Sequence, residues 1–263
     1  SGSVSTSFEV PPLPGGSYSV KVGDTTPVDF ILTSSFSIGT FSGPPGTTVT
    51  LSGSGFAANT NVGLTFDGNT IRTVTTDING SLSTSFQVPE APGGPRSVGV
   101  FEAGRGATQT TFTVTPKLTL DRRNSSPGSS VAATGTGFTA NERAISVTLN
   151  QKLVASDITA DADGSWYASL LIPSLPAGSH TVRASGSLTS LSTVPSVTLT
   201  LGAVVSLDWS SGPPGSSLKV SGSGFRPGES VVVTIGDDLG EAVVSADTQG
   251  AWTVDMQVPS SAS

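Results

Sequence analysis

Apolar and polar residues alternate along short segments of this chain. In residues 34–115, runs in which apolar residues alternate with Ser, Thr or Gly are separated by Gly, Pro, Asn and Asp about every 8–12 residues. This period of two is typical of strands with one buried face, and no segment has the i, i+3, i+4, i+7 spacing of a core-facing helix. The pattern predicts an antiparallel β-sandwich with seven strands, at about 36–41, 47–54, 61–67, 70–76, 81–88, 96–102 and 108–114.

The pattern repeats along the chain. Gly53-Ser54-Gly55-Phe56 returns as Gly135-Thr136-Gly137-Phe138 and again as Gly222-Ser223-Gly224-Phe225, at spacings of 82 and 87 residues. A repeat of this length is a small domain rather than a solenoid unit. The sequence therefore predicts complete domains at 34–115 and 116–201, the C-terminal part of a repeat at 1–33 and the N-terminal part of another at 202–263.

Aligning the repeats predicts which aromatic residues are buried. Phe56 and Phe138 follow the paired glycines, which allow the strand to bend so that the ring turns inward. Trp166 and Trp252 align with Leu82 at a core position, whereas Trp209 aligns with the outward Thr40. We expect the first four aromatic residues to be buried and Trp209 to face outward.

The segments Gly46–Phe56 and Gly215–Phe225 share the element G-x-x-V/L-x-V/L-S-G-S-G-F. This element resembles the IPT/TIG and related bacterial and archaeal immunoglobulin-like surface domains, and as repeats the likeness covers essentially the whole chain. The Asp-x-x-Gly hairpins depart from that pattern and look more like tandem modules of prokaryotic cell-surface and S-layer proteins. The resemblance implies an all-β chain of tandem immunoglobulin-like β-sandwich domains in a linear array, in an extracellular setting, and it supplies no ligand.

Composition excludes several classes of chemistry. The chain has no cysteine and one histidine, so it has no disulfide framework, thiol nucleophile, Cys-based zinc site or cluster of histidines. Twelve basic residues against nineteen acidic ones give no electrostatic footprint for nucleic acid. No apolar run approaches the roughly 20 residues of a membrane span.

No residue is predicted to be catalytic. His180 aligns with Tyr18 and Arg96, which indicates a large amphipathic side chain at the start of a strand rather than a ligand or a general base. Isopeptide cross-links, which need a buried lysine, are disfavoured because the four lysines fall at unrelated repeat positions: Lys21, Lys117, Lys152 and Lys219. We expect the chain not to be an enzyme.

Asp161-Ala162-Asp163-Gly164 is the strongest candidate for a metal site, with carboxylates at i and i+2. The same spacing suits a hairpin turn in which the first Asp caps its own backbone. The second acid becomes Asn79 and Gln249 in the other copies, and no bidentate Glu follows at the spacing of a calcium loop. The turn is the leading interpretation, and calcium binding by Asp161 and Asp163, or between domains by Asp237, Asp238 and Glu241, is the alternative.

Two glycosylation sequons occur, at Asn79-Gly80-Ser81 and Asn124-Ser125-Ser126. Both are predicted to lie in turns, where an acceptor asparagine must be exposed.

The leading functional hypothesis is structural. Val114-Thr115-Pro116-Lys117-Leu118 carries one predicted last strand almost directly into the next first strand, and a short linker with proline limits bending. This favours a cell-surface filament, sheath, S-layer or adhesin stalk. A module that binds surface glycans or a protein is the alternative, and accessory domains of a secreted glycoside hydrolase are a third interpretation.

The two terminal parts are complementary. Residues 202–263 carry the first five strands of a repeat, and residues 12–33 carry its turn and last two strands. Either the sequence is an excerpt from a longer tandem array, or separate subunits join head to tail and complete each other's sandwich. Residues 2–11 and 250–259 duplicate one strand, which counts against the second interpretation. Both predict that Val20 and Phe30 pack against residues 202–263 of the next unit.

Overall fold

The computed structural model describes residues 3, 5–236 and 240–260. Regular structure in these residues consists of strands and turns, and none of them forms a helix able to cross a membrane. The chain divides into two compact units, Ser1–Thr115 and Pro116–Ser263. We call residues 34–115 the first module, 116–201 the second and 202–263 the third.

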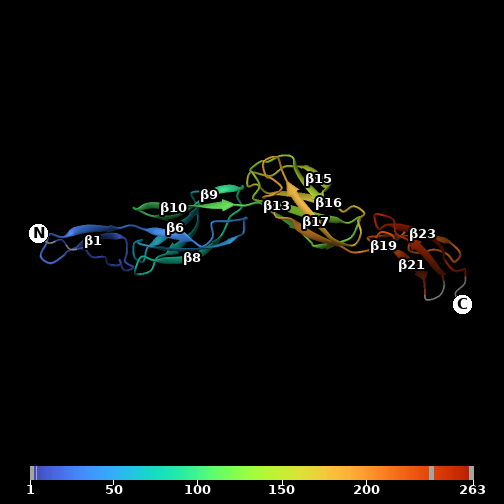
Figure 1. Ribbon diagram of the computed structural model, residues 1–263, viewed down its shortest axis with the longest axis horizontal. Helices are drawn as coiled ribbons and strands as arrows, with labels where there is room; N and C mark the ends of the chain where they lie inside the picture. The colour runs from blue at the N-terminus through green and yellow to red at the C-terminus, as the bar shows by residue number, and fades with distance from the viewer. Residues whose placement is uncertain (1–2, 4, 237–239, 261–263) are drawn as a thin grey trace. The chain divides into compact units, whose positions relative to one another are not determined.

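The first module is a sandwich of two sheets (Figure 1). One sheet has the order β3-β5-β8 and the other β4-β10-β9-β6-β7. Fifteen buried apolar residues fill the space between them. The strands are β3 (Ser35–Ile38), β4 (Ser42–Gly43), β5 (Thr48–Ser54), β6 (Asn61–Phe66), β7 (Asn69–Thr75), β8 (Leu82–Gln87), β9 (Gly94–Glu102) and β10 (Gly106–Val114).

The predicted strand 36–41 is wrong as a single strand. β3 runs antiparallel to β5 and ends at Ile38, and β4 then pairs parallel with β10 in the other sheet. The N–H of Gly39 still donates to Thr50 O at 2.9 Å, and Phe41 O already accepts the N–H of Thr113 at 2.8 Å. The chain crosses between the sheets over these few residues.

The second module repeats this plan, with sheets in the orders β11-β13-β16 and β12-β18-β17-β14-β15. Here too the first strand is divided, and β12 pairs parallel with β18. Eighteen buried residues form the core. The strands are β11 (Lys117–Leu120), β12 (Asn124–Ser125), β13 (Ser130–Thr136), β14 (Ile145–Leu149), β15 (Lys152–Ile158), β16 (Trp166–Leu171), β17 (Gly178–Ser185) and β18 (Val197–Leu201).

The remaining strands form smaller assemblies. In the third module one sheet has the order β19-β20-β23 and a second contains β21 and β22. The strands are β19 (Val204–Leu207), β20 (Ser217–Ser223), β21 (Ser230–Ile235), β22 (Gly240–Ser245) and β23 (Trp252–Gln257). Near the N-terminus, β1 (Gly16–Val20) and β2 (Val28–Leu32) form a two-stranded hairpin, which we call the N-terminal hairpin.

The two glycines of the Gly-x-Gly-Phe element serve different purposes, as the second module shows. A Cβ on Gly135 would lie 2.1 Å from the indole nitrogen of Trp166, so this position must be bare for the ring to cover it. Gly137 has φ +68°, which favours glycine. Phe138 then turns into the core and meets Trp166 edge-on, with ring centroids 5.4 Å apart.

The predicted burial of the aromatic residues is confirmed except at Trp209. Phe56 and Phe138 are fully buried, and Trp166 and Trp252 are also buried. Trp209 is half-buried rather than outward, because its ring packs where a Cβ of Gly212 would otherwise lie, 2.0 Å from a ring carbon. The alignment with Thr40 could not reveal this local contact.

Candidate functional site

His180 lies at the start of β17 and both of its ring nitrogens are engaged. Asn150 Oδ1 accepts the N–H of Thr181 at 3.0 Å, which orients the amide so that Nδ2 faces His180 Nδ1 at 2.7 Å. Nδ1 is therefore the acceptor, and Nε2–H donates to Pro176 O at 2.8 Å. No ring nitrogen is left for a metal or for proton transfer.

The aligned side chains in the other repeats form an equivalent hydrogen bond with a different donor group. Tyr18 Oη donates to Pro14 O at 2.6 Å, and Arg96 Nε donates to Pro92 O at 3.0 Å. Each spans four residues, as His180 does to Pro176. His180 is thus part of a recurring turn, as its alignment with Tyr18 and Arg96 predicts.

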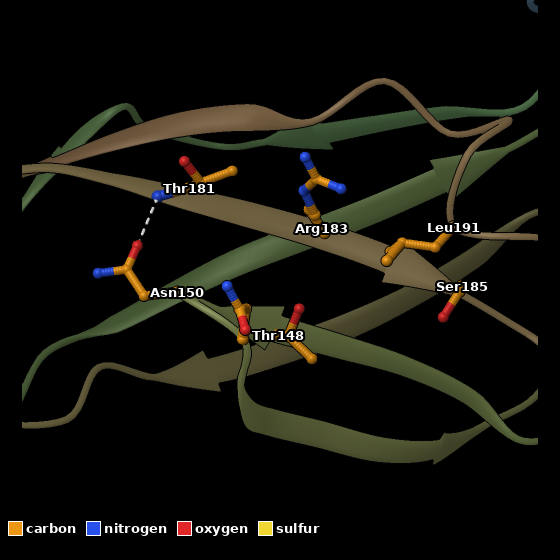
Figure 2. Close-up of a pocket in the computed structure, with 7 residues that line it drawn as sticks. Thr148, Asn150, Thr181, Arg183, Ser185 and Leu191 are labelled. Carbon is orange, nitrogen blue, oxygen red and sulfur yellow. Dashed lines mark hydrogen bonds between the residues drawn. The ribbon is translucent and has the colours of Figure 1, made fainter.

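The second module carries a polar groove on the outer face of its larger sheet (Figure 2). The groove has a volume of about 630 Å³. Figure 2 shows side chains from β14, from β17 and from the loop after β17 around it. Neither a carboxylate nor an aromatic ring is among the lining residues, which are Thr148, Asn150, Gln151, Thr181, Arg183, Ser185 and Leu191. Hydroxyl, amide and guanidinium groups can hydrogen-bond a polar ligand, but they provide no acid–base pair.

Sequence reasoning missed a buried carboxylate in the second module. Glu142 is 2% exposed. Its Oε1 accepts the N–H groups of Leu188 and Thr189, both at 2.6 Å, and its Oε2 accepts the Thr189 hydroxyl at 2.5 Å and the N–H of Thr139 at 3.2 Å. The carboxylate therefore fastens the loop between β17 and β18 to the turn after Phe138.

Two opposing effects act on this carboxyl group. Burial raises the pKa of Glu142, and the hydrogen bonds from Thr189, Leu188 and Thr139 lower it. The hydrogen bonds prevail, so the pKa lies below its ordinary value of 4.5 and the group is ionised at neutral pH.

A glutamate recurs at this corner in every module. The residue after the recurring Phe of the Gly-x-Gly-Phe element donates its N–H to Glu102 in the first module at 2.8 Å and to Glu229 in the third at 2.7 Å. Glu142 and Glu229 share one repeat position, a signal visible in the sequence. Glu102 comes instead from the end of β9, and no alignment of repeats would find it.

The Asp-x-x-Gly segments form the predicted turns. Asp161 Oδ1 accepts the N–H groups of Asp163 at 3.0 Å and Ser165 at 2.8 Å. Asp77 and Asp247 make the same pair of bonds in their own turns. Within the described residues, no three His, Cys, Asp or Glu side chains are grouped to hold a metal ion. Calcium binding by Asp161 and Asp163 stays a prediction.

The other predicted site residues are dispersed. Asp237 and Asp238 lie outside the described residues, and Glu241 is exposed on β22. Asn79 is exposed in a turn, as predicted. Asn124 is also exposed, but it lies in β12 rather than in a turn, because the divided first strand pairs there with β18.

Solved structures that align with the chain come from multidomain proteins. The adhesin FdeC of Escherichia coli is 14% identical, with 87% of this chain and 89% of that chain covered and a TM-score of 0.27. Invasin, a bacterial integrin-binding protein, is 16% identical, with 88% and 55% covered and a TM-score of 0.28. The Bacteroides ovatus protein SGBP-B, in complex with a mixed-linkage heptasaccharide, is 18% identical, with 67% and 46% covered and a TM-score of 0.31. These likenesses carry no argument about function, and no curated protein matches the chain.

The sequence of the first module matches a known family model. Residues 31–114 match the model of the IPT/TIG domain. The match ends where β10 ends, at Val114, and spans all eight strands of the first module. This match confirms, for residues 31–114, the resemblance read from the Gly-x-Gly-Phe element.

Proposed function

We propose that this chain is a repeat segment of an extracellular structural protein, as in a cell-surface filament, a sheath, a surface layer or an adhesin stalk. The observation that carries the proposal is the reuse of one sandwich plan. The first and second modules have the same two sheet orders, including the divided first strand. The third module shares the order of the three-stranded sheet, β19-β20-β23. Repetition of a module without a change of plan serves length better than it serves a single site.

The connection between modules supports a mechanical role. β10 ends at Val114 and β11 begins at Lys117, so only Thr115 and Pro116 separate two strands. Proline fixes its own φ and restricts the residue before it, and such a linker has little freedom to bend.

The hydrogen bonds of the polar side chains described above also support a structural role. The side chains of His180, Glu142 and Asp161 all form hydrogen bonds with turns and loops of their own module. We therefore propose no catalytic role for them.

Small-angle X-ray scattering of the protein tests this proposal. A compact chain of 263 residues has a radius of gyration of about 18 Å. A stiff array should give a much larger value that stays constant with salt and temperature. A value near that of a compact chain, or one that varies widely with conditions, would contradict a stalk or filament.

A second candidate function rests on the polar groove of Figure 2. Its hydroxyl, amide and guanidinium groups suit a glycan or a polar peptide. Glycan platforms commonly add exposed Trp or Tyr rings. Trp166 and Trp252 are buried, and the exposed Tyr167 lies on β16, in the other sheet. A glycan array probed with the protein and with Arg183→Ala tests this candidate: binding that the substitution abolishes would favour it, and the absence of binding would remove it.

A further inference from the structure

The second module departs from the shared plan beside the polar groove of Figure 2. Residues 186–196 connect β17 to β18, whereas only residues 103–105 connect β9 to β10 in the first module. This longer connection, which we call the groove loop, supplies Leu191 to the lining of the groove. A loop that is added to a rigid sandwich does not lengthen an array, and such loops are where binding residues are commonly found.

The groove loop is anchored at both of its ends. The buried Glu142 accepts two backbone N–H groups of the loop and the hydroxyl of Thr189. A Cβ on Gly186 would lie 2.3 Å from Glu142 Oε1, so this position must be bare for the carboxylate to fit. At the other end Val194 is buried in the core of the module. The loop therefore holds Leu191, which is 43% exposed, in a fixed position at the wall of the groove.

The first module has different side chains at the equivalent place. Thr65 pairs with Gly99 on the outer face of its larger sheet, as Thr148 pairs with Arg183 in the second module. A Cβ on Gly99 would lie 2.7 Å from Thr65 Oγ1 and 3.3 Å from Gln109 Cγ, so these two side chains occupy the space. The second module thus carries a guanidinium where the first carries no side chain.

Arg183 has no acidic neighbour in the groove. Asn150 takes the place of Asp67 of the first module, because each side-chain oxygen accepts the N–H of the residue opposite, Thr181 at 3.0 Å and Ser97 at 2.9 Å. An amide thus replaces a carboxylate at the groove. Among the described residues the ion pairs involve other arginines, so the guanidinium of Arg183 has no carboxylate partner. It is free to bind an anion.

We propose that the groove binds an acidic glycan and that Arg183 binds the carboxylate of a uronic acid residue. This inference rests on the second candidate function above and names its class of ligand. A guanidinium presents paired N–H donors that match a carboxylate in bidentate geometry. The other polar groups of the groove can hydrogen-bond sugar hydroxyls, and they belong to Thr148, Thr181, Ser185 and Gln151.

The position of the groove favours a glycan over a peptide. β14 and β17 each have a neighbouring strand on both sides, so a peptide cannot add to either of them as a further strand. The groove therefore recognises its ligand through side chains. Its volume of about 630 Å³ lies within the usual range for sites that bind small ligands.

The charge of the groove favours isolated carboxylates over a densely sulfated polymer. Arg183 is the single basic residue among the lining residues. A polymer with many sulfates needs several cations for neutralisation, and the net charge of −7 on this chain repels such a polymer.

Isothermal titration calorimetry of the full chain tests the proposal. The probes are trisaccharides of galacturonic, guluronic and mannuronic acid, together with the methyl ester of each, which lacks the charge of the carboxylate. At least one acid should bind, and its ester should bind roughly tenfold more weakly or worse, because the ester loses the charge-assisted bonds to Arg183. Arg183→Ala should weaken binding of the acid by a similar factor and binding of the ester little.

Three further variants separate the guanidinium from charge in general. Arg183→Lys should bind the acid with intermediate affinity, because an ammonium keeps the charge but loses the planar pair of donors. Thr181→Asp, at an exposed position of the groove, should weaken binding of the acid by repulsion. Arg123→Ala is the matched control: it removes the same charge from an exposed position of the second module outside the groove lining, and it should leave binding unchanged.

The outcomes separate this inference from the function on which it rests. Equal binding of acid and ester, or full binding of the acid by Arg183→Ala, would overturn the inference and leave the candidate of a glycan-binding groove standing. Tighter binding of a sulfated galactose trisaccharide, or of an acidic peptide, than of every uronic acid would show that the ligand class is wrong. Binding of none of these probes, and of no glycan on the array, would remove both the inference and the candidate function.

Discussion

At the scale of single residues, each module fastens the backbone beside its core phenylalanine with a glutamate. Glu142 is the most deeply engaged of the three, with four hydrogen bonds that tie the loop after β17 to the rest of the second module. Glu229 occupies the same repeat position on the surface. The same repeat position is therefore buried in the second module and exposed in the third. We expect its contribution to stability to differ accordingly, because only in the second module does a loop cover it.

Glu142→Gln should destabilise the second module by about 1–3 kcal/mol, because the amide would present a donor to N–H groups that now meet a carboxylate. Calorimetry of the full chain measures the effect as a lower unfolding temperature of one transition. Glu229→Gln is the matched control and should change stability little. Equal shifts for the two variants would show that burial of Glu142 does not matter.

The same residue predicts an acid dependence. The pKa of Glu142 is lowered in the folded state, so its contribution to stability is complete above its ordinary value of 4.5 and is lost as pH falls through the folded value. The native second module should lose stability in that acid range, and Glu142→Gln should lose less over the same range. Identical pH profiles for the two proteins would contradict this assignment.

Trp166→Ala should cost about 3–5 kcal/mol in the second module, because it leaves a large cavity beside Phe138. Trp209→Ala in the third module should lower the free energy of unfolding by less, since that ring is only half-buried and lies over Gly212. Chemical denaturation of each variant, followed by circular dichroism, compares the two. Similar losses would show that our view of Trp209 is wrong.

At the scale of elements, the Asp-x-x-Gly turn is held by its first carboxylate. Asp161→Ala should lower the unfolding temperature of the second module, since two backbone N–H groups lose their acceptor, and Asp163→Ala should have little effect. Removing calcium with a chelator should change neither result.

A calcium site would behave differently. Added calcium would raise the unfolding temperature of the native protein by mass action, and Asp163→Ala would abolish the rise. That result would overturn the turn interpretation and establish the metal site that the sequence leaves as an alternative.

The positions of most strands could be predicted from the sequence, because the local alternation of apolar and polar residues determines them. Alternation placed β5 to β10 to within about two residues, because strand bounds follow side-chain burial and turn residues. The division of the first strand into β3 and β4 could not be predicted. It depends on β10, which lies about seventy residues further along and offers β4 a parallel edge.

Among the residues of the candidate site, too, some roles could be predicted from the sequence and others could not. The role of His180 in its turn could be predicted from three aligned positions, because the side chain at each position bonds a carbonyl four residues earlier in the chain. The buried Glu142 and Glu102 could not, because their partners come from loops and strands distant in sequence. The half-burial of Trp209 likewise arises from a contact that the other repeats lack.

At the scale of the whole molecule, the account joins two observations. One sandwich plan recurs along the chain, and only Thr115 and Pro116 separate β10 from β11. Together they support the proposal of a stiff array of modules.

Negative-stain electron microscopy of the native protein tests this central claim most directly. The account predicts single chains seen as rods of constant length, because the short linkers hold the modules in a stiff row. Compact particles, or chains bent at variable angles between modules, would contradict it.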